Sequence, residues 1–106
     1  MRAVTEPGSQ VIDLVSRVDA TTVTELRRTL QAAIDLGVGD LVVDLSAVTV
    51  LDAAGLGMLV AAHRRANRAG RRLVLRSVPS SVGRVLAMTR LHRVLNVERA
   101  PAMASA

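Results

Sequence analysis

Asp44 and Asp52 are the two side chains whose type and spacing best suit metal chemistry, because paired carboxylates can hold a divalent cation. Each follows an apolar, β-branched run, so both are expected near strand ends. Receiver domains, which accept a phosphoryl group on such an aspartate, also need an early acidic pair and a later lysine. This chain has no lysine and no such pair. The sequence therefore favours a structural role for Asp44, whose carboxylate would accept hydrogen bonds from backbone amides.

Catalytic side chains are scarce elsewhere in the sequence. His63 and His92 lie far apart, without metal-ligand spacing and without a serine elbow. The absence of cysteine excludes thiolate catalysis. The Gly-Leu-Gly at residues 55–57 lacks the spacing of a phosphate-binding loop. We therefore predict a protein that is not an enzyme, with no catalytic residue, no metal and no cofactor.

The remaining candidate site is a helix start within the segment LSAVTVLDAAGLGMLV, residues 45–60. An apolar, β-branched run ends at Asp52, and a helical pattern follows directly. The Asp52 carboxylate is expected to accept amide hydrogens of the first turn, an N-cap worth about 0.5–2 kcal/mol. Gly55 and Gly57 each cost roughly 1 kcal/mol relative to alanine inside a helix. Either close packing on a sheet or close approach by another protein's backbone would offset that cost.

Alternating strand and helix patterns must position these residues. The first helix carries Thr22 and Glu25 at the spacing of a capping box. Pro79 and a serine cap open the third helix. The periodicity predicts strands at residues 2–5, 10–16, 40–45, 73–76 and 94–98, with helices that begin near Thr22, Ala53 and Pro79.

This alternation predicts an α/β class fold: a single small domain with a mixed, mostly parallel sheet of four to five strands and helices packed on it. We expect the domain to cover residues 1–99, with a turn at 6–9 and a disordered tail at 100–106. In such folds, function gathers where strands end and helices begin. The start of the second helix is therefore the best candidate site.

Composition narrows the possible partners. The chain has no aromatic residue, which argues against single-stranded nucleic-acid binding. Its net charge of +5 is moderate. A basic run at the end of the second helix favours a solvated surface, with an acidic partner or anionic headgroups as the minor alternative. The first ten residues do not form a signal peptide, and Asp52 interrupts the one long apolar window. We therefore expect a cytoplasmic protein without direct membrane insertion. The basic run comprises Arg64, Arg65, Arg68, Arg71 and Arg72.

Three stretches of the sequence resemble the STAS domain, in particular the bacterial anti-sigma factor antagonists, over residues 10–98. Their most specific element is a strand that ends in Asp-Leu-Ser, followed by apolar residues and then Asp-x-x-Gly-Leu at a helix start. The stretches are SRVDATTVTELRRTL, LVVDLSAVTVLDAAGLGMLVAAHRRANRAGRRLVL and VPSSVGRVLAMTRLHRVLNV.

The resemblance implies a phosphorylation switch that this chain lacks. In antagonists, a Ser or Thr directly after the helix-start aspartate is phosphorylated by the partner anti-sigma factor, a serine kinase, and phosphorylation breaks their complex. Ala53 occupies that position here and has no oxygen to accept a phosphoryl group. Ser16 and Arg90 replace glycines usual in the family, and Arg90 would be strained at a positive φ. The implied partner-binding residues are Asp19, Ser46, Thr49, Asp52, Ala53, Ala54, Gly55 and Gly57.

Three functions remain open from the sequence. The leading hypothesis is an antagonist-like regulator that binds an anti-sigma factor kinase and is not controlled by phosphorylation. The second is a cytoplasmic STAS accessory subunit of a lipid-type ABC transporter. The third is a ligand-sensing STAS domain in a signalling scaffold. Fold alone does not decide between them.

Overall fold

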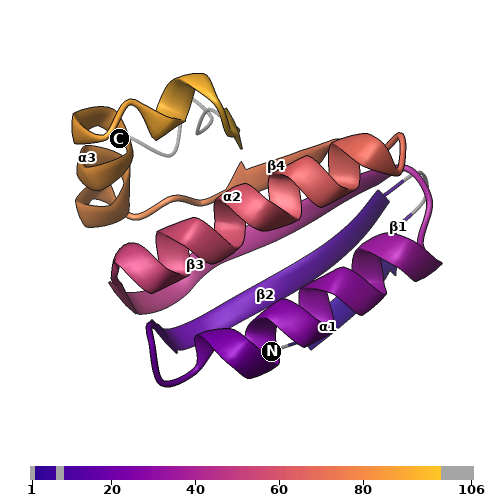
Figure 1. Cartoon of the computed structure of the whole chain (residues 1–106), viewed down its shortest axis with the longest axis horizontal. Coiled ribbons are helices and arrows are strands. Elements are labelled where there is room, and N and C mark those ends of the chain that lie inside the picture. Colours follow the sequence, from indigo (N-terminus) through magenta and orange to yellow (C-terminus); the bar gives the residue numbers. More distant parts are fainter. Residues whose placement is uncertain (1, 7–8, 99–106) are drawn as a thin grey trace.

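Strands and helices alternate along the chain in the computed structural model, which describes residues 2–6 and 9–98 (Figure 1). All five predicted strands and all three predicted helices are present. The predicted turn lies partly, and the predicted tail entirely, outside the described residues. The elements are β1 (Arg2–Glu6), β2 (Ser9–Val18), α1 (Val23–Leu36), β3 (Asp40–Leu51), α2 (Ala53–Arg68), β4 (Leu73–Arg76), α3 (Ser80–Met88), the 3-10 helix η1 (Leu91–Arg93) and β5 (Asn96–Val97).

The five strands form one mixed sheet in the order β1-β2-β3-β4-β5, which confirms the predicted fold class. β1 pairs with β2 antiparallel, and every other pair is parallel. Helices α1 and α2 lie side by side on one face of the sheet (Figure 1). Alternate residues of β3 point into the core between the sheet and these two helices, because successive side chains of a strand point to opposite faces. Leu41, Val43 and Leu45 are fully buried there.

Arg71 corrects the prediction of a fully solvated basic run. Arg71 is 5% exposed, and its guanidinium donates hydrogen bonds to the carbonyl oxygens of Ala33 (2.9 Å) and Ile34 (3.1 Å) in the last turn of α1. It also donates to the carbonyl oxygens of Gly39 and Val38. The last carbonyls of a helix lack partners within that helix. Arg71 supplies a donor to the Ile34 carbonyl and adds a second bond to the Ala33 carbonyl, which also accepts from the Gly37 amide (3.1 Å). Burial lowers the pKa of Arg71.

Two predicted helix caps are wrong. The Thr22 hydroxyl accepts from the Asp19 amide (3.1 Å) and donates to the Arg17 carbonyl (3.0 Å), so it makes no cap bond to α1. It is held by the preceding loop, and the capping box with Glu25 does not form. The cap position of α3 is Pro79, so the serines that follow it lie inside the helix.

Among residues 2–6 and 9–98, three residues other than glycine adopt the left-handed backbone conformation: Ser16 (φ 59°), Ser77 (φ 55°) and Arg90 (φ 61°). For L-residues this conformation costs roughly 1–2 kcal/mol, whereas glycine adopts it freely. Ser16 and Arg90 are the positions at which the family resemblance implied glycine. The strain expected at Arg90 is therefore confirmed.

Replacing Ser16 or Arg90 with glycine should stabilise the protein by about 0.5–1 kcal/mol each, because relief of strain exceeds the added entropy of the unfolded chain. Urea unfolding of each variant measures this change. Arg64→Gly is the control, since this exposed residue lies inside α2, and it should lose roughly 1 kcal/mol. Losses at residues 16 and 90 as large as the control's would contradict the strain argument.

Candidate functional site

The candidate site lies where β2 and β3 end and α2 begins (Figure 1). The predicted end of β3 at residue 45 is wrong, because the strand continues to Leu51. Its pairing with β2 survives two register shifts, one between Asp13 and Val15 and one between Ser16 and Arg17. Such bulges let a strand continue while they bend it and increase its twist. Residues 46–51 are therefore a bent strand and not a loop.

Ser46 and Thr49 lie on this bent part of β3, and both side chains are exposed. The Ser46 hydroxyl donates to the Asp44 carboxylate (2.6 Å), which also accepts from the Ser46 amide (2.8 Å). The Thr49 hydroxyl donates to the Ser16 carbonyl (3.2 Å). The structural role predicted for Asp44 is confirmed, and both hydroxyls stabilise the bent strand.

Asp52 fixes the geometry of the site. One carboxylate oxygen accepts from the Gly55 amide (3.0 Å), which confirms the predicted N-cap. The other accepts from the Ala20 amide (3.2 Å) in the loop before α1. A single side chain therefore joins the start of α2 to a loop that lies 32 residues earlier in the sequence.

Asp19 lies in that same loop and is 5% exposed. Its carboxylate accepts from the hydroxyl (2.6 Å) and the amide (3.0 Å) of Thr21, and from Arg17 (2.8 Å). These bonds, the Thr21 hydroxyl first, hold the pKa of Asp19 below its usual value. The structure thus brings Asp19 and Asp52 close together at this end of the sheet. Both carboxylates already accept hydrogen bonds from nearby groups of the chain itself. The bonds that Arg17 and Thr21 make to Asp19, and that Ala20 makes to Asp52, could not be predicted from the sequence pattern.

Gly55 and Gly57 serve different purposes in the first turns of α2. A Cβ atom on Gly55 would lie 2.3 Å from the Val18 carbonyl oxygen, so α2 packs on β2 too closely for any side chain. A Cβ atom on Gly57 would meet no atom within 4 Å. Close packing therefore explains Gly55 and leaves Gly57 unexplained within the described residues. Ala53 is exposed at the first position of the helix, and Ala54 packs partly against the core.

An apolar crevice of about 270 Å³ lies beside this helix start, between the end of β3 and α3. Valine and leucine side chains form most of its walls. Because α3 is distant in sequence, the periodicity could not reveal this crevice. Its lining residues are Thr49, Val50, Leu51, Ser81, Val82 and Val85.

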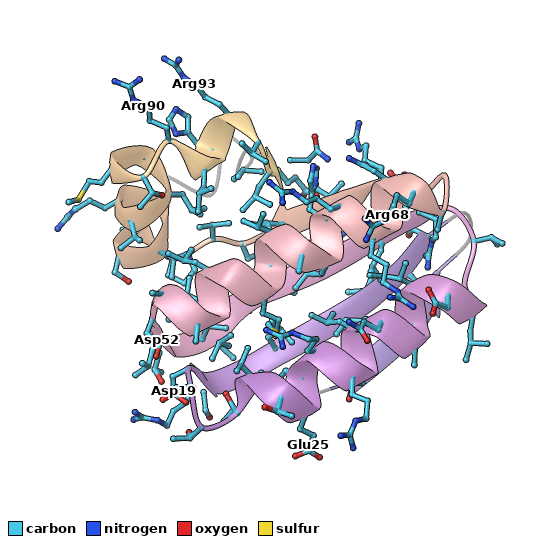
Figure 2. The ribbon with its side chains drawn as sticks, in the orientation of Figure 1. Asp19, Glu25, Asp52, Arg68, Arg90 and Arg93 are labelled. Carbon is cyan, nitrogen blue, oxygen red and sulfur yellow. The ribbon has the colours of Figure 1, made fainter. Side chains whose placement is uncertain are left out.

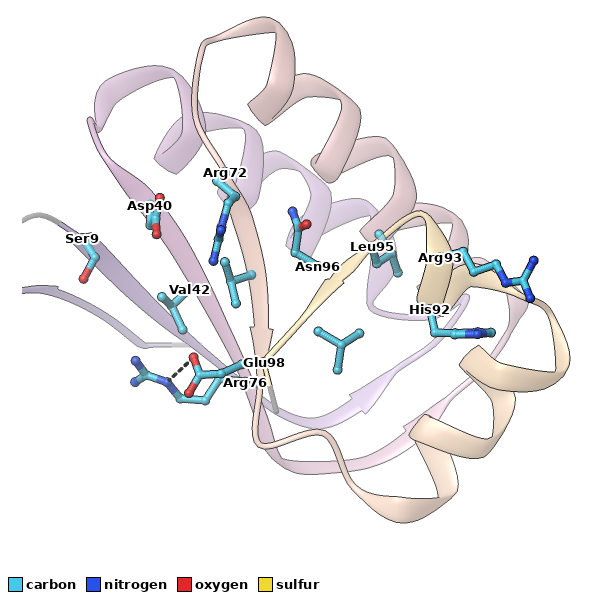
Figure 3. A pocket seen from close by; sticks show the side chains of 12 residues that line it. Ser9, Asp40, Val42, Arg72, Arg76, His92, Arg93, Leu95, Asn96 and Glu98 are labelled. Atoms are coloured by element: carbon cyan, nitrogen blue, oxygen red, sulfur yellow. Dashed lines mark ion pairs between the residues drawn. The ribbon is translucent and has the colours of Figure 1, made fainter. Parts of the chain in front are cut away.

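A larger depression of about 600 Å³ lies on another part of the molecule (Figure 3). None of the predicted site residues lines it. Its charged side chains do not converge on one point: Arg76 is 3.6 Å from Glu98, and Arg93 points away from Arg72 (Figure 3). This arrangement favours a solvated surface over a ligand site.

At the start of α2, residues 53–57 carry no hydroxyl and no ionisable side chain, and the Asp52 carboxylate before them is engaged as the N-cap. Over residues 2–6 and 9–98, no three His, Cys, Asp or Glu side chains gather as they would around a metal ion. None of the helices there is long and apolar enough to cross a bilayer.

A mixed sheet with α1 and α2 on one face, and a tight Asp-x-x-Gly helix start where the central strand β3 ends, is the arrangement that the resemblance to the STAS domain implied. The chain belongs to the STAS_2 family, since the family model described as "Mlab, STAS domain" matches residues 1–97.

Solved structures share the same fold. An anti-sigma factor antagonist from Mycobacterium paratuberculosis has a TM-score of 0.79 at 24% identity, over 93% of this chain and 84% of that one. A STAS-domain antagonist from Planctomyces limnophilus has a TM-score of 0.79 at 21% identity, over 97% and 92%. A sulfate transporter family protein from Wolinella succinogenes has a TM-score of 0.73 at 17% identity, over 89% and 79%. At these identities the likeness establishes the fold.

Proposed function

We propose that this chain is an antagonist-like regulatory protein that binds an anti-sigma factor of the serine-kinase type through the start of α2. The observation that carries the proposal is Ala53, which is exposed at the first helical position directly after the Asp52 N-cap. The chain presents at that position the small, neutral shape that the unmodified form of an antagonist would present.

The absence of a switch follows from the chemistry of position 53. Phosphorylation would add about −1.5 to −2 charges at this helix start, and a partner surface fitted to a neutral residue would reject them. Alanine has no oxygen atom to modify. The nearest hydroxyls on β3, Ser46 and Thr49, hydrogen-bond to Asp44 and to the Ser16 carbonyl. The proposal is therefore a complex that forms without control by phosphorylation.

Gly57 supports close approach by a partner. It is exposed on α2, costs roughly 1 kcal/mol of helix stability relative to alanine, and has open space where a side chain would lie. Ala53 lies one helical turn earlier, so the two residues are neighbours on the helix surface. Together they form a patch without large side chains, which the backbone of a partner could approach closely.

A second candidate is a STAS accessory subunit of a lipid-type ABC transporter. The match to the family model described as "Mlab, STAS domain" favours it, and the Wolinella succinogenes protein shows that the fold also occurs in a transporter family. Both functions use a protein partner. They differ in the identity of that partner.

Affinity capture from the native organism separates the two functions. The full chain is immobilised, bound proteins are identified by mass spectrometry, and the Ala53→Asp variant is the control. A serine-kinase anti-sigma factor that binds the parent and not the variant supports the leading proposal. A transporter ATPase that behaves in this way supports the second candidate. Equal capture by parent and variant would place the interface elsewhere.

Ala53→Asp should weaken binding to the purified partner by about tenfold or more, equivalent to 1.4 kcal/mol. The helix dipole tolerates the new charge, so the fold should persist, but the partner would have to bury an unpaired carboxylate. Calorimetric titration measures the change. Ala53→Ser is the neutral control and should bind like the parent protein. Retained affinity in Ala53→Asp would contradict the docking surface.

A further inference from the structure

Helix α3 has an inner and an outer face. Val82 and Leu86 are buried in the core. The outer face comprises Ser81, Arg84, Val85 and Met88, spaced three and four residues apart so that they follow one side of the helix. Met88 is 77% exposed, and Val85 lines the crevice beside the end of β3. A partly apolar helix face therefore continues from the crevice, and none of the described residues covers it.

The charge around this face has one sign. Residues 77–97 contain Arg84, Arg90 and Arg93 and no acidic residue. None of these three arginines makes an ion pair with another described residue. Figure 2 shows Arg90, from the turn after α3, and Arg93, from η1, pointing outward, while Asp19 and Asp52 lie near the start of α2 and Glu25 lies further away on α1. The field over α3 is therefore positive.

We infer that the partner surface extends from the start of α2, through the crevice, onto the outer face of α3, and that it takes an acidic amphipathic segment of the partner. An apolar side chain of that segment occupies the crevice and contacts Val85 and Met88. Its carboxylates pair with Arg84 and Arg90. The inference rests on the proposed function, because the crevice shares Thr49 with the candidate site.

The dimensions of the crevice fit one large apolar side chain. A cavity of roughly 150 Å³ holds a benzene molecule, and the crevice of about 270 Å³ is open on one side. Covering an exposed methionine also removes apolar surface from water, which favours association. The positive charge of the surrounding arginines then favours a negatively charged partner and increases its rate of association.

A protein segment explains this surface better than a membrane or a nucleic acid. The chain has no aromatic residue, whereas interfacial membrane helices and single-strand binders rely on aromatic side chains. A carboxylate-bearing segment can use both the arginines and the apolar crevice.

The test uses two helical probe peptides that carry leucine on one side and, on the other, glutamate in one peptide and lysine in the second. Amide NMR spectra of the folded full chain are recorded during titration with each. The glutamate peptide should shift residues 49–51 and 81–93, and the lysine peptide should not. Equal shifts with both peptides, or none with either, would overturn the inference. Binding to phosphatidylserine vesicles without binding to the glutamate peptide would also overturn it, in favour of a membrane.

Variants on exposed positions locate the contact. Arg84→Glu and Met88→Asp should each weaken binding of the glutamate peptide by about threefold, and about tenfold together, as expected for a central apolar contact flanked by charge. Arg64→Glu and Val38→Asp are the matched controls, since both residues are exposed on other parts of the surface, and they should change affinity little. Equal effects of variants and controls would overturn the inference.

The same variants separate this inference from the proposed function when the purified partner replaces the peptide. If Ala53→Asp weakens binding and the α3 variants do not, the proposed function stands and the extension onto α3 is wrong. If only the α3 variants weaken it, the α3 surface stands and the role of Ala53 is wrong.

Discussion

Gly55→Ala should lower the free energy of unfolding by about 3 kcal/mol, at the upper end of the usual cost of overpacking. The new methyl group would lie 2.3 Å from the Val18 carbonyl oxygen and 2.7 Å from a methyl carbon of Leu51. The carbonyl belongs to the end of a paired strand, so it cannot move without disturbing the sheet. The substitution should therefore push α2 away from β2.

Gly57→Ala is the matched control, because it places the same methyl group two residues further along the same helix. Nothing lies within 4 Å of that methyl group, so the variant should gain up to about 1 kcal/mol from helix propensity. Urea unfolding of both variants gives the comparison. Similar stabilities of the two variants would show that α2 does not approach β2 as closely as described.

Arg71→Met should cost about 3 kcal/mol, because methionine keeps much of the apolar volume but removes every donor. The carbonyl oxygens of Ala33, Ile34 and Gly39 would then lack the bonds that Arg71 now makes to them. The Ala33 carbonyl keeps its bond from the Gly37 amide, so the loss falls mainly on the Ile34 and Gly39 carbonyls. A buried acceptor left unsatisfied costs about 1–3 kcal/mol, and partial access to water reduces the sum.

The neighbouring Arg72 supplies the control for that prediction. It is exposed, and Arg72→Met should change stability by no more than about 0.5 kcal/mol. Thermal and urea unfolding measure both variants. Hydrogen exchange should also show faster opening of the last turn of α1 in Arg71→Met alone. Equal stability of the two variants would contradict the role of Arg71 at the end of α1.

The sequence predicted the elements well because their patterns are local. The apolar, β-branched runs of β3 and β4 predict strands, and the spacing of apolar residues along α2 predicts a helix. Asp52 was predicted as a cap from its own position and the helix that follows it. The family resemblance also pointed to Ser16 and Arg90, where the backbone proved to be left-handed.

Features that depend on distant neighbours could not be predicted in this way. Arg71 and Arg72 are identical in type and adjacent, yet only Arg71 reaches the end of α1. Gly55 and Gly57 look equivalent until the position of the Val18 carbonyl is known. The extension of β3 depends on irregular pairing with β2, which no period in one strand reveals. Each of these features is decided by tertiary contacts.

The strand order follows the order of synthesis, because every strand pairs with the one made directly before it. Such pairing allows a growing chain to add one strand at a time, since each new strand finds its neighbour already made. The site residues from Asp19 to Gly57 all precede residue 60, so they can assemble on the ribosome before α3 completes the crevice beside them. The end of α1 has to wait longer, until Arg71 has been synthesised and can reach its carbonyls.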